Sequence, residues 1–198
     1  MRMKAMLAAI AVAAAGCIAG KLTAQVAPAA RAGGFPISVG VGMSGYYLDW
    51  GDSRWMEGPV IRAGVGLYHG IGVDFSARSI FMNTPSDLTR MQQSTFLLGA
   101  FYNAPSIGRV HPFARYSGGI GLIEFPSRNP LYTRDTYTVY AVGGGVEYQL
   151  TRKAALRAEY EYQFWKDFQS PKYLNPQGVT LGVNYYLRGR HVRPHTLN

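Results

Sequence analysis

The stretch Leu156-Arg157-Ala158-Glu159-Tyr160-Glu161-Tyr162-Gln163-Phe164 alternates apolar and polar residues without a break. Because successive side chains of a strand point to opposite faces, this period of two predicts a β-strand with two unlike faces. In a soluble sandwich the polar face would meet water and the apolar face the core. In a membrane barrel the apolar face would meet lipid and the polar face the lumen. The stretch therefore predicts a strand and leaves these two architectures open.

The same alternation recurs along the rest of the chain, with small or polar residues on one face of each stretch. An aromatic content of 13% and 24 glycines, against 16% charged residues, also favour strands and tight turns over helices. The fourth stretch is ambiguous in register. The predicted strands lie near residues 37–44, 61–67, 71–78, 91–103, 115–122, 142–150, 156–164 and 179–187.

The connections between these strands alternate in length. Those near 51–56, 82–90, 126–136 and 167–177 are longer and polar, those near 68–70 and 151–153 are tight, and 104–110 is intermediate. Short periplasmic turns alternating with longer external loops are typical of bacterial outer-membrane barrels. The sequence therefore predicts an all-β fold, an eight-stranded antiparallel up-and-down transmembrane β-barrel with both chain ends on the periplasmic side.

Aromatic residues gather toward the predicted strand ends, as in the interfacial belts of lipid-facing barrels. This placement favours lipid over a soluble core, and a soluble lipocalin-like barrel is the alternative. We expect one belt near the external ends and one near the other ends. The first comprises Tyr46, Tyr47, Trp50, Trp55, Phe81, Phe125, Phe164 and Trp165, and the second Tyr68, Tyr102, Phe113, Tyr148 and Tyr185.

Residues 1–30 have the layout of a secretory signal, with Arg2 and Lys4 before an apolar, alanine-rich run and small residues near Ala24. We expect cleavage after Ala24, which leaves Gln25 as the mature N-terminus. A transmembrane anchor is one alternative. A second is lipidation of Cys17, because Ala14-Ala15-Gly16-Cys17 resembles a lipobox. The predicted organisation is a signal peptide at 1–24, a linker at 25–34, the barrel at 35–188 and a tail at 189–198.

Beyond residue 35 the sequence has no apolar run approaching the ~20 residues that a membrane-spanning helix needs. A mature membrane protein of this sequence would have to be a barrel. Over roughly residues 35–188 the chain resembles the bacterial outer-membrane β-barrel family, the OmpA-like or porin-family small barrels. The resemblance is carried by the stretches 135–148, 157–165 and 175–183. It implies an outer-membrane location, contact with outer-membrane lipid, and the barrel-insertion machinery as a partner during biogenesis.

Charged residues on the predicted inner face form the most informative group of the sequence. They comprise four basic and four acidic side chains, and the interior of an eight-stranded barrel is just wide enough to be filled by side chains. Buried charges persist where they are paired, so we expect a network that closes the lumen. A narrow ion or proton path is the alternative. The predicted network is Arg62, Asp74, Arg78, Arg115, Glu147, Arg157, Glu159 and Glu161.

Other chemistry finds little support in the residues. Gly40-Val41-Gly42-Met43-Ser44-Gly45 matches a dinucleotide fingerprint, yet a strand and not a helix is predicted to follow it. None of His69, His111, His191 and His195 has a second ligand at metal spacing, so we expect no metal and no cofactor. His69 and His111 are expected to lie at the membrane interface, at or beside periplasmic turns.

The predicted role is structural or one of surface interaction, not catalysis. The net charge of +9 comes from scattered basic residues, so we expect no nucleic-acid partner. We expect a monomer, with a specific function, if there is one, carried by the external loops; the ligand is unknown. A low-conductance pore is the first alternative. A lipid-modifying barrel enzyme is less favoured, because no histidine falls in the external half of a predicted strand.

Overall fold

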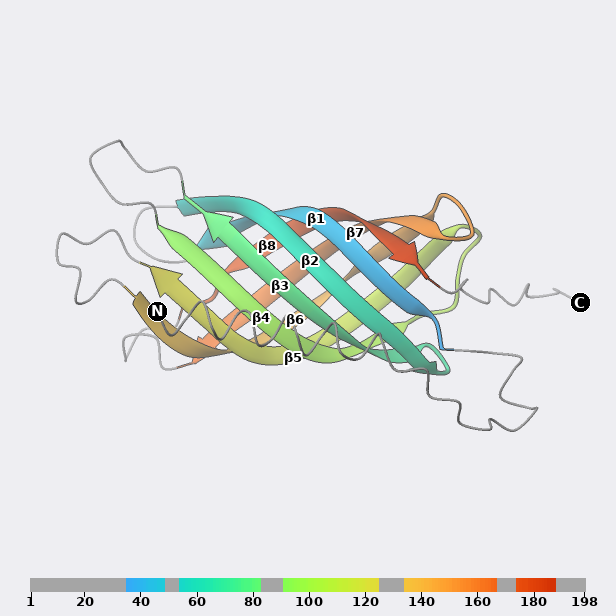
Figure 1. The fold of residues 1–198 in the computed structure, drawn as a ribbon, viewed down its shortest axis with the longest axis horizontal. Coiled ribbons are helices and arrows are strands. Elements are labelled where there is room, and N and C mark those ends of the chain that lie inside the picture. The colour runs from blue at the N-terminus through green and yellow to red at the C-terminus, as the bar shows by residue number, and fades with distance from the viewer. Residues whose placement is uncertain (1–34, 49–53, 83–90, 125–133, 167–173, 188–198) are drawn as a thin grey trace, which may run out of the picture. The chain divides into compact units, whose positions relative to one another are not determined.

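The computed structural model describes residues 35–48, 54–82, 91–124, 134–166 and 174–187, which form one closed barrel (Figure 1). Each strand pairs antiparallel with the next along the chain, and β1 pairs with β8 to close the sheet. The predicted eight-stranded up-and-down barrel is confirmed. The strands are β1 (Ile37–Leu48), β2 (Arg54–Tyr68), β3 (Ile71–Phe81), β4 (Gln92–Asn103), β5 (Val110–Glu124), β6 (Arg134–Gln149), β7 (Ala154–Lys166) and β8 (Gln177–Tyr186).

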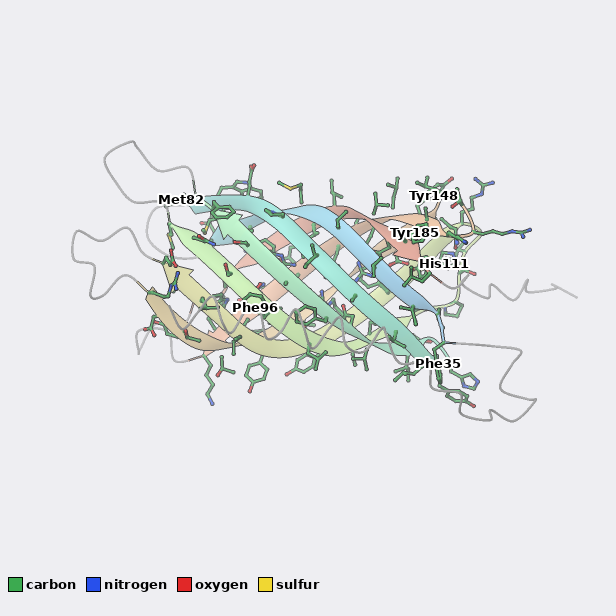
Figure 2. The ribbon with its side chains drawn as sticks, viewed as in Figure 1. Phe35, Met82, Phe96, His111, Tyr148 and Tyr185 are labelled. Atoms are coloured by element: carbon green, nitrogen blue, oxygen red, sulfur yellow. The ribbon has the colours of Figure 1, made fainter. Side chains whose placement is uncertain are left out.

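The two faces of the sheet follow the alternation in the sequence. On β7, Leu156, Tyr160 and Phe164 are exposed on the outside, while Glu159 and Glu161 are buried in the lumen. Across the described strands the outward side chains are mostly exposed and apolar, and Figure 2 shows them standing off the barrel wall. A surface of this kind suits lipid, because a soluble barrel would turn its apolar residues inward. Within the described ranges, no helix is long and apolar enough to cross a membrane.

The two ends of the barrel differ in their connections. At one end, here named the turn end, short segments join the strands at 69–70, 104–109 and 150–153, and β1 begins and β8 ends there. His69 and Gly70 both have positive φ, as two-residue hairpin turns require. Figure 2 labels Phe35, His111, Tyr148 and Tyr185 at the turn end.

The opposite end, here named the loop end, corresponds to the longer predicted connections. Segments 49–53, 83–90, 125–133 and 167–173 lie outside the described residues. The predicted loop boundaries were wrong by a few residues, because strand pairing continues through polar sequence. Arg54 lies in the stretch predicted as a loop at 51–56 but pairs with Leu48. Arg134 lies in the stretch predicted as a loop at 126–136 but pairs with Glu124. Backbone pairing does not depend on the polarity of the side chain, so polarity alone overestimates loop length.

Three predicted belt aromatics in fact face the lumen. Tyr46 and Trp165 are fully buried, and Phe113 is 5% exposed. The physical reason is the pleat: Tyr46 lies two residues from Ser44, and Trp165 lies four from Glu161, so each shares the inner face with these residues. Trp50 and Phe125 lie outside the described residues.

His111 is 4% exposed and lies among the lumen residues of β5, so its predicted interface position was wrong, again because of strand parity. The ambiguous register of β4 is resolved, because Gln93, Thr95 and Leu97 are buried on the inner face. The signal peptide, the linker, the tail and Cys17 lie outside the described residues and stay predictions.

Candidate functional site

The predicted charge network occupies the lumen toward the turn end and the middle of the barrel. All eight of its residues lie on inner faces, contributed by β2, β3, β5, β6 and β7. The side chains that form its ion pairs are at most 13% exposed. We call these eight residues the charge layer. Its four positive and four negative groups lie within reach of one another across a narrow interior.

Glu159 is the centre of the charge layer because three arginines from three strands converge on it. Its carboxylate accepts hydrogen bonds from Arg62 Nη1, from Arg115 Nη1 at 3.1 Å and from Arg157 Nε at 2.9 Å. The side chains of Glu159 and Arg115 are completely buried. Charge-assisted hydrogen bonds of this kind are about twice as strong as neutral ones, so Glu159 ties β2, β5 and β7 together across the barrel.

Glu161 forms a second centre, nearer the loop end. Its Oε1 accepts hydrogen bonds from Arg78 Nη1, Tyr46 OH and Gln163 Nε2, each at 2.8 Å. Arg115 Nη1 lies 3.4 Å from Oε2 of the same carboxylate. Arg78 also stacks over the ring of Tyr46, with 4.5 Å from its Cζ to the ring centroid. The buried tyrosine thus contributes both a hydrogen-bond donor and a cation–π surface to the network.

Glu147 forms the third centre, at the turn end. It accepts hydrogen bonds from Arg157 Nη1 at 2.9 Å, from Asn184 Nδ2 at 2.7 Å and from the hydroxyl of Tyr186. The guanidinium of Arg157 stacks on Phe113, with Cζ 3.7 Å from the ring centroid. The predicted network omitted Phe113, Asn184 and Tyr186, although the alternation already placed Asn184 and Tyr186 on the inner face of β8.

Asp74 has the fewest contacts in the charge layer. Its Oδ2 lies 3.3 Å from Arg115 Nη2, whereas Oδ1 is buried without a hydrogen-bond partner. Arg62 Nη2 is likewise buried and unpartnered. Both residues line a cavity of about 50 Å³ at the turn end, together with Ser38, Gly64 and Tyr186.

Small hydroxyl side chains fill the remaining polar space of the charge layer. Ser44 accepts a hydrogen bond from Arg78 Nε at 3.0 Å and lies 2.9 Å from the hydroxyl of Thr180. Arg115 Nη2 approaches Ser76 and Ser117 at 3.3 and 3.4 Å. The inner-face serines of the sequence were predicted as small residues, and the register shows them as hydrogen-bond partners of the arginines.

Above the charge layer, toward the loop end, most buried lumen side chains are apolar, and the amides of Gln93 and Gln163 lie among them. The apolar members of this level are each at most 1% exposed. We call this group the apolar cap. Sequence reasoning missed it, because outer-membrane lumens are usually polar. The apolar cap comprises Tyr46, Leu48, Met56, Ile80, Met91, Leu97, Ile123, Val139, Ala141, Trp165 and Leu174.

Trp165 joins the apolar cap to the charge layer. Its ring lies against Gly121, where any Cβ would overlap the indole, so glycine at this position makes room for tryptophan. The indole Nε1 donates to Gln163 Oε1 at 2.9 Å, and Gln163 in turn donates to Glu161. This chain satisfies the polar atom of the ring at the boundary between the two layers.

The described residues hold no arrangement for metal binding, since no group of three or more His, Cys, Asp or Glu side chains in them could hold an ion. The two histidines in the described ranges, His69 and His111, both lie at or beside the turn end. The buried acids are bonded to arginines, which hold them as structural partners. The geometry suits closure of the lumen and cross-strand anchoring.

Comparison with known proteins agrees with this architecture. Neisserial surface protein A has a TM-score of 0.62 at 17% identity, covering 75% of this chain and 96% of its own. Ail, the attachment invasion locus protein of Yersinia pestis, has a TM-score of 0.57 at 15% identity, covering 77% and 98%. OprG from Pseudomonas aeruginosa has a TM-score of 0.51 at 13% identity, covering 78% and 97%. No curated protein matches the chain.

At these identities the solved structures show a shared fold and nothing narrower. The family model of the outer membrane protein beta-barrel domain matches residues 7–186, which is most of the sequence. The match includes all eight strands of the closed barrel. The chain therefore belongs to the bacterial outer-membrane β-barrel family and is a protein of the outer membrane.

Proposed function

We propose that this protein is a monomeric, non-conducting and non-enzymatic barrel with a structural or surface-interaction role, carried by the connections at its loop end. The observation that supports this most is the filled lumen. Paired charges occupy its turn-end and middle parts, and the apolar cap occupies its loop end. Ion passage needs a continuous wet path, and apolar constrictions expel water. Such a barrel is a rigid scaffold, and function on rigid scaffolds commonly resides in loops.

A low-conductance pore is the second candidate, and the turn-end cavity of about 50 Å³ is the feature that favours it. Two structural relatives are named as a surface protein and an attachment invasion locus protein, and these names apply to those proteins alone. For this chain, the closed lumen is the observation that supports the proposed surface role. Outer-membrane lipid is the proposed partner of the exposed apolar residues, and the barrel-insertion machinery is the proposed partner during biogenesis.

Electrical recording tests the non-conducting barrel directly. Purified protein in planar lipid bilayers in concentrated potassium chloride should give no steady conductance above the bare bilayer. A conducting porin in the same bilayers is the positive control, and the same sample unfolded by boiling is the contamination control. Reproducible, voltage-independent steps from the folded protein that disappear after boiling would replace the closed barrel with the pore.

We propose further that the loop end faces the cell exterior. A recognition sequence for a specific protease, inserted in 125–133, should be cut when the protease is added to intact cells. The matched control places the same sequence between Ser106 and Ile107, in the turn at 104–109, and should be cut only after the outer membrane is permeabilised. Cleavage of the 104–109 insertion alone in intact cells would invert the orientation.

A further inference from the structure

We propose that the lumen is a blind half-channel. Its turn-end part is a hydrated vestibule that binds water between charged side chains, and the apolar cap, not the charge layer, is the barrier to solutes. This inference deepens the proposed closed barrel, and it assigns closure to a different group of residues from the charge network expected from the sequence.

The more exposed of the charged lumen side chains lie toward the turn end. The side chains of Arg157, Asp74 and Arg62 are 13%, 8% and 7% exposed, so solvent reaches them. Deeper in the barrel, the side chains of Arg115 and Glu161 are at most 1% exposed. The apolar cap beyond them is equally inaccessible. The accessible charged side chains thus lie on the turn-end side of the lumen, which indicates that water enters from the turn end.

The turn-end cavity has the size and the polar lining that bound water requires. About 10–15 Å³ is enough for one water, and the cavity measures about 50 Å³. Asp74 Oδ1 accepts and Arg62 Nη2 donates, and both are buried there without protein partners. A buried polar atom left unpaired is destabilising, so water bonded to these atoms would stabilise the fold. The cavity therefore has room for water, and two of the residues that line it each carry an unpartnered polar atom.

The apolar cap has the opposite chemistry. Leu48, Met56, Ile80 and Ile123 present no polar side-chain atoms, and they come from four different strands, so together they close the interior from several sides. Water in such a layer would lose hydrogen bonds without replacement. Paired charges, by contrast, can be hydrated at their free edges. Hence the apolar cap is the layer that solutes cannot cross.

Thiol labelling distinguishes the two layers, because the one native cysteine, Cys17, can be changed to serine beforehand. Gly64→Cys places a thiol in the vestibule, where the nearest atom to the new Cβ is the Ser38 hydroxyl at 3.1 Å. Val139→Cys places a thiol in the apolar cap. Gly64 and Val139 are both buried, so the two variants differ mainly in the layer of the lumen in which the thiol lies. The probe is a small, charged, membrane-impermeant thiol reagent applied to the folded protein in detergent.

The folded Gly64→Cys variant should react roughly ten times faster than Val139→Cys, or more, after each rate is divided by its rate in urea-unfolded protein to correct for thiol ionisation. Far-ultraviolet circular dichroism verifies that both variants are folded, and Ser38→Cys serves as a second vestibule position should Gly64→Cys not fold. If both vestibule thiols are as inert as Val139→Cys, the vestibule is wrong while the closed barrel stands. If Gly64→Cys reacts rapidly and Val139→Cys reacts equally rapidly, the cap is no barrier. Conductance of the unmodified protein would then show separately whether the closed barrel also fails.

Discussion

Replacing Glu159 by alanine is expected to lower the free energy of unfolding by about 3–5 kcal/mol, the usual cost of breaking a buried ion pair. The change leaves Arg62, Arg115 and Arg157 facing one another without the carboxylate that they share. Arg115 keeps Asp74 and Glu161, and Arg157 keeps Glu147, so Arg62 is the group most affected. The measurement is reversible urea unfolding in detergent micelles, followed by tryptophan fluorescence.

The matched control is Glu124→Ala, which removes the partner of Arg134 at the loop end. Both side chains of that pair are substantially exposed, so the loss should stay within about 1 kcal/mol. Glu159→Gln separates charge from volume, because the amide retains the size of the side chain and one acceptor oxygen. It should fall between wild type and Glu159→Ala. Equal midpoints for wild type and Glu159→Ala would mean that the arginines are hydrated and the charge layer is not a stabilising network.

Trp165→Ala is expected to cost about 3–5 kcal/mol as well, for a different physical reason. The indole is the largest fully buried side chain of the apolar cap, and its removal leaves a cavity. It also takes one of two donors from Gln163 Oε1, which keeps only the longer bond from Gln93 Nε2 at 3.4 Å. The control is Trp55→Ala, because Trp55 is 53% exposed on the outer face and should contribute much less. Urea unfolding in micelles, followed by circular dichroism, measures both.

A double-mutant cycle tests whether the loss arises where the structure places it. Gly121→Ala alone should be destabilising, because its new Cβ would overlap the indole of Trp165. In the Trp165→Ala background that overlap is gone, so the same change should be nearly neutral or partly fill the cavity. Additive effects of the two changes would show that Trp165 does not lie against Gly121.

Strand parity, read from the sequence, predicted much of this barrel and all eight charged lumen residues. Each of them has a small or polar residue two positions away on one side, as Glu159 has Arg157, so the inner face could be recognised from the sequence. The same rule also indicated Asn184 and Tyr186, which proved to be partners of Glu147. The prediction was wrong for Tyr46 and Trp165, because their position along the strand was used and their parity was not.

The pairing of the charges could not be predicted, because parity gives the face of a residue and not its height in the barrel. Height depends on strand tilt and stagger, which follow from the hydrogen-bond register of the closed sheet. Arg62 and Glu159 lie on strands that are not adjacent, yet they meet across the lumen. The apolar cap could not be predicted from the sequence for a related reason. Met56, Ile80 and Val139 are unremarkable singly and form a cluster only when the tilted strand ends converge.

The contact between Arg62 and Glu159 also constrains how the chain can enter a membrane. The two residues are 97 positions apart in the sequence, so no single hairpin contains both. A β2–β3 hairpin that crossed the bilayer alone would carry Arg62 into hydrocarbon without Glu159, its ion-pair partner in the closed barrel, which is strongly unfavourable. That pair forms only when distant strands meet, and closing so long a loop is slow. Insertion of this barrel should therefore be a late, concerted event, in which the sheet curls toward closure while its inner face is still in contact with water.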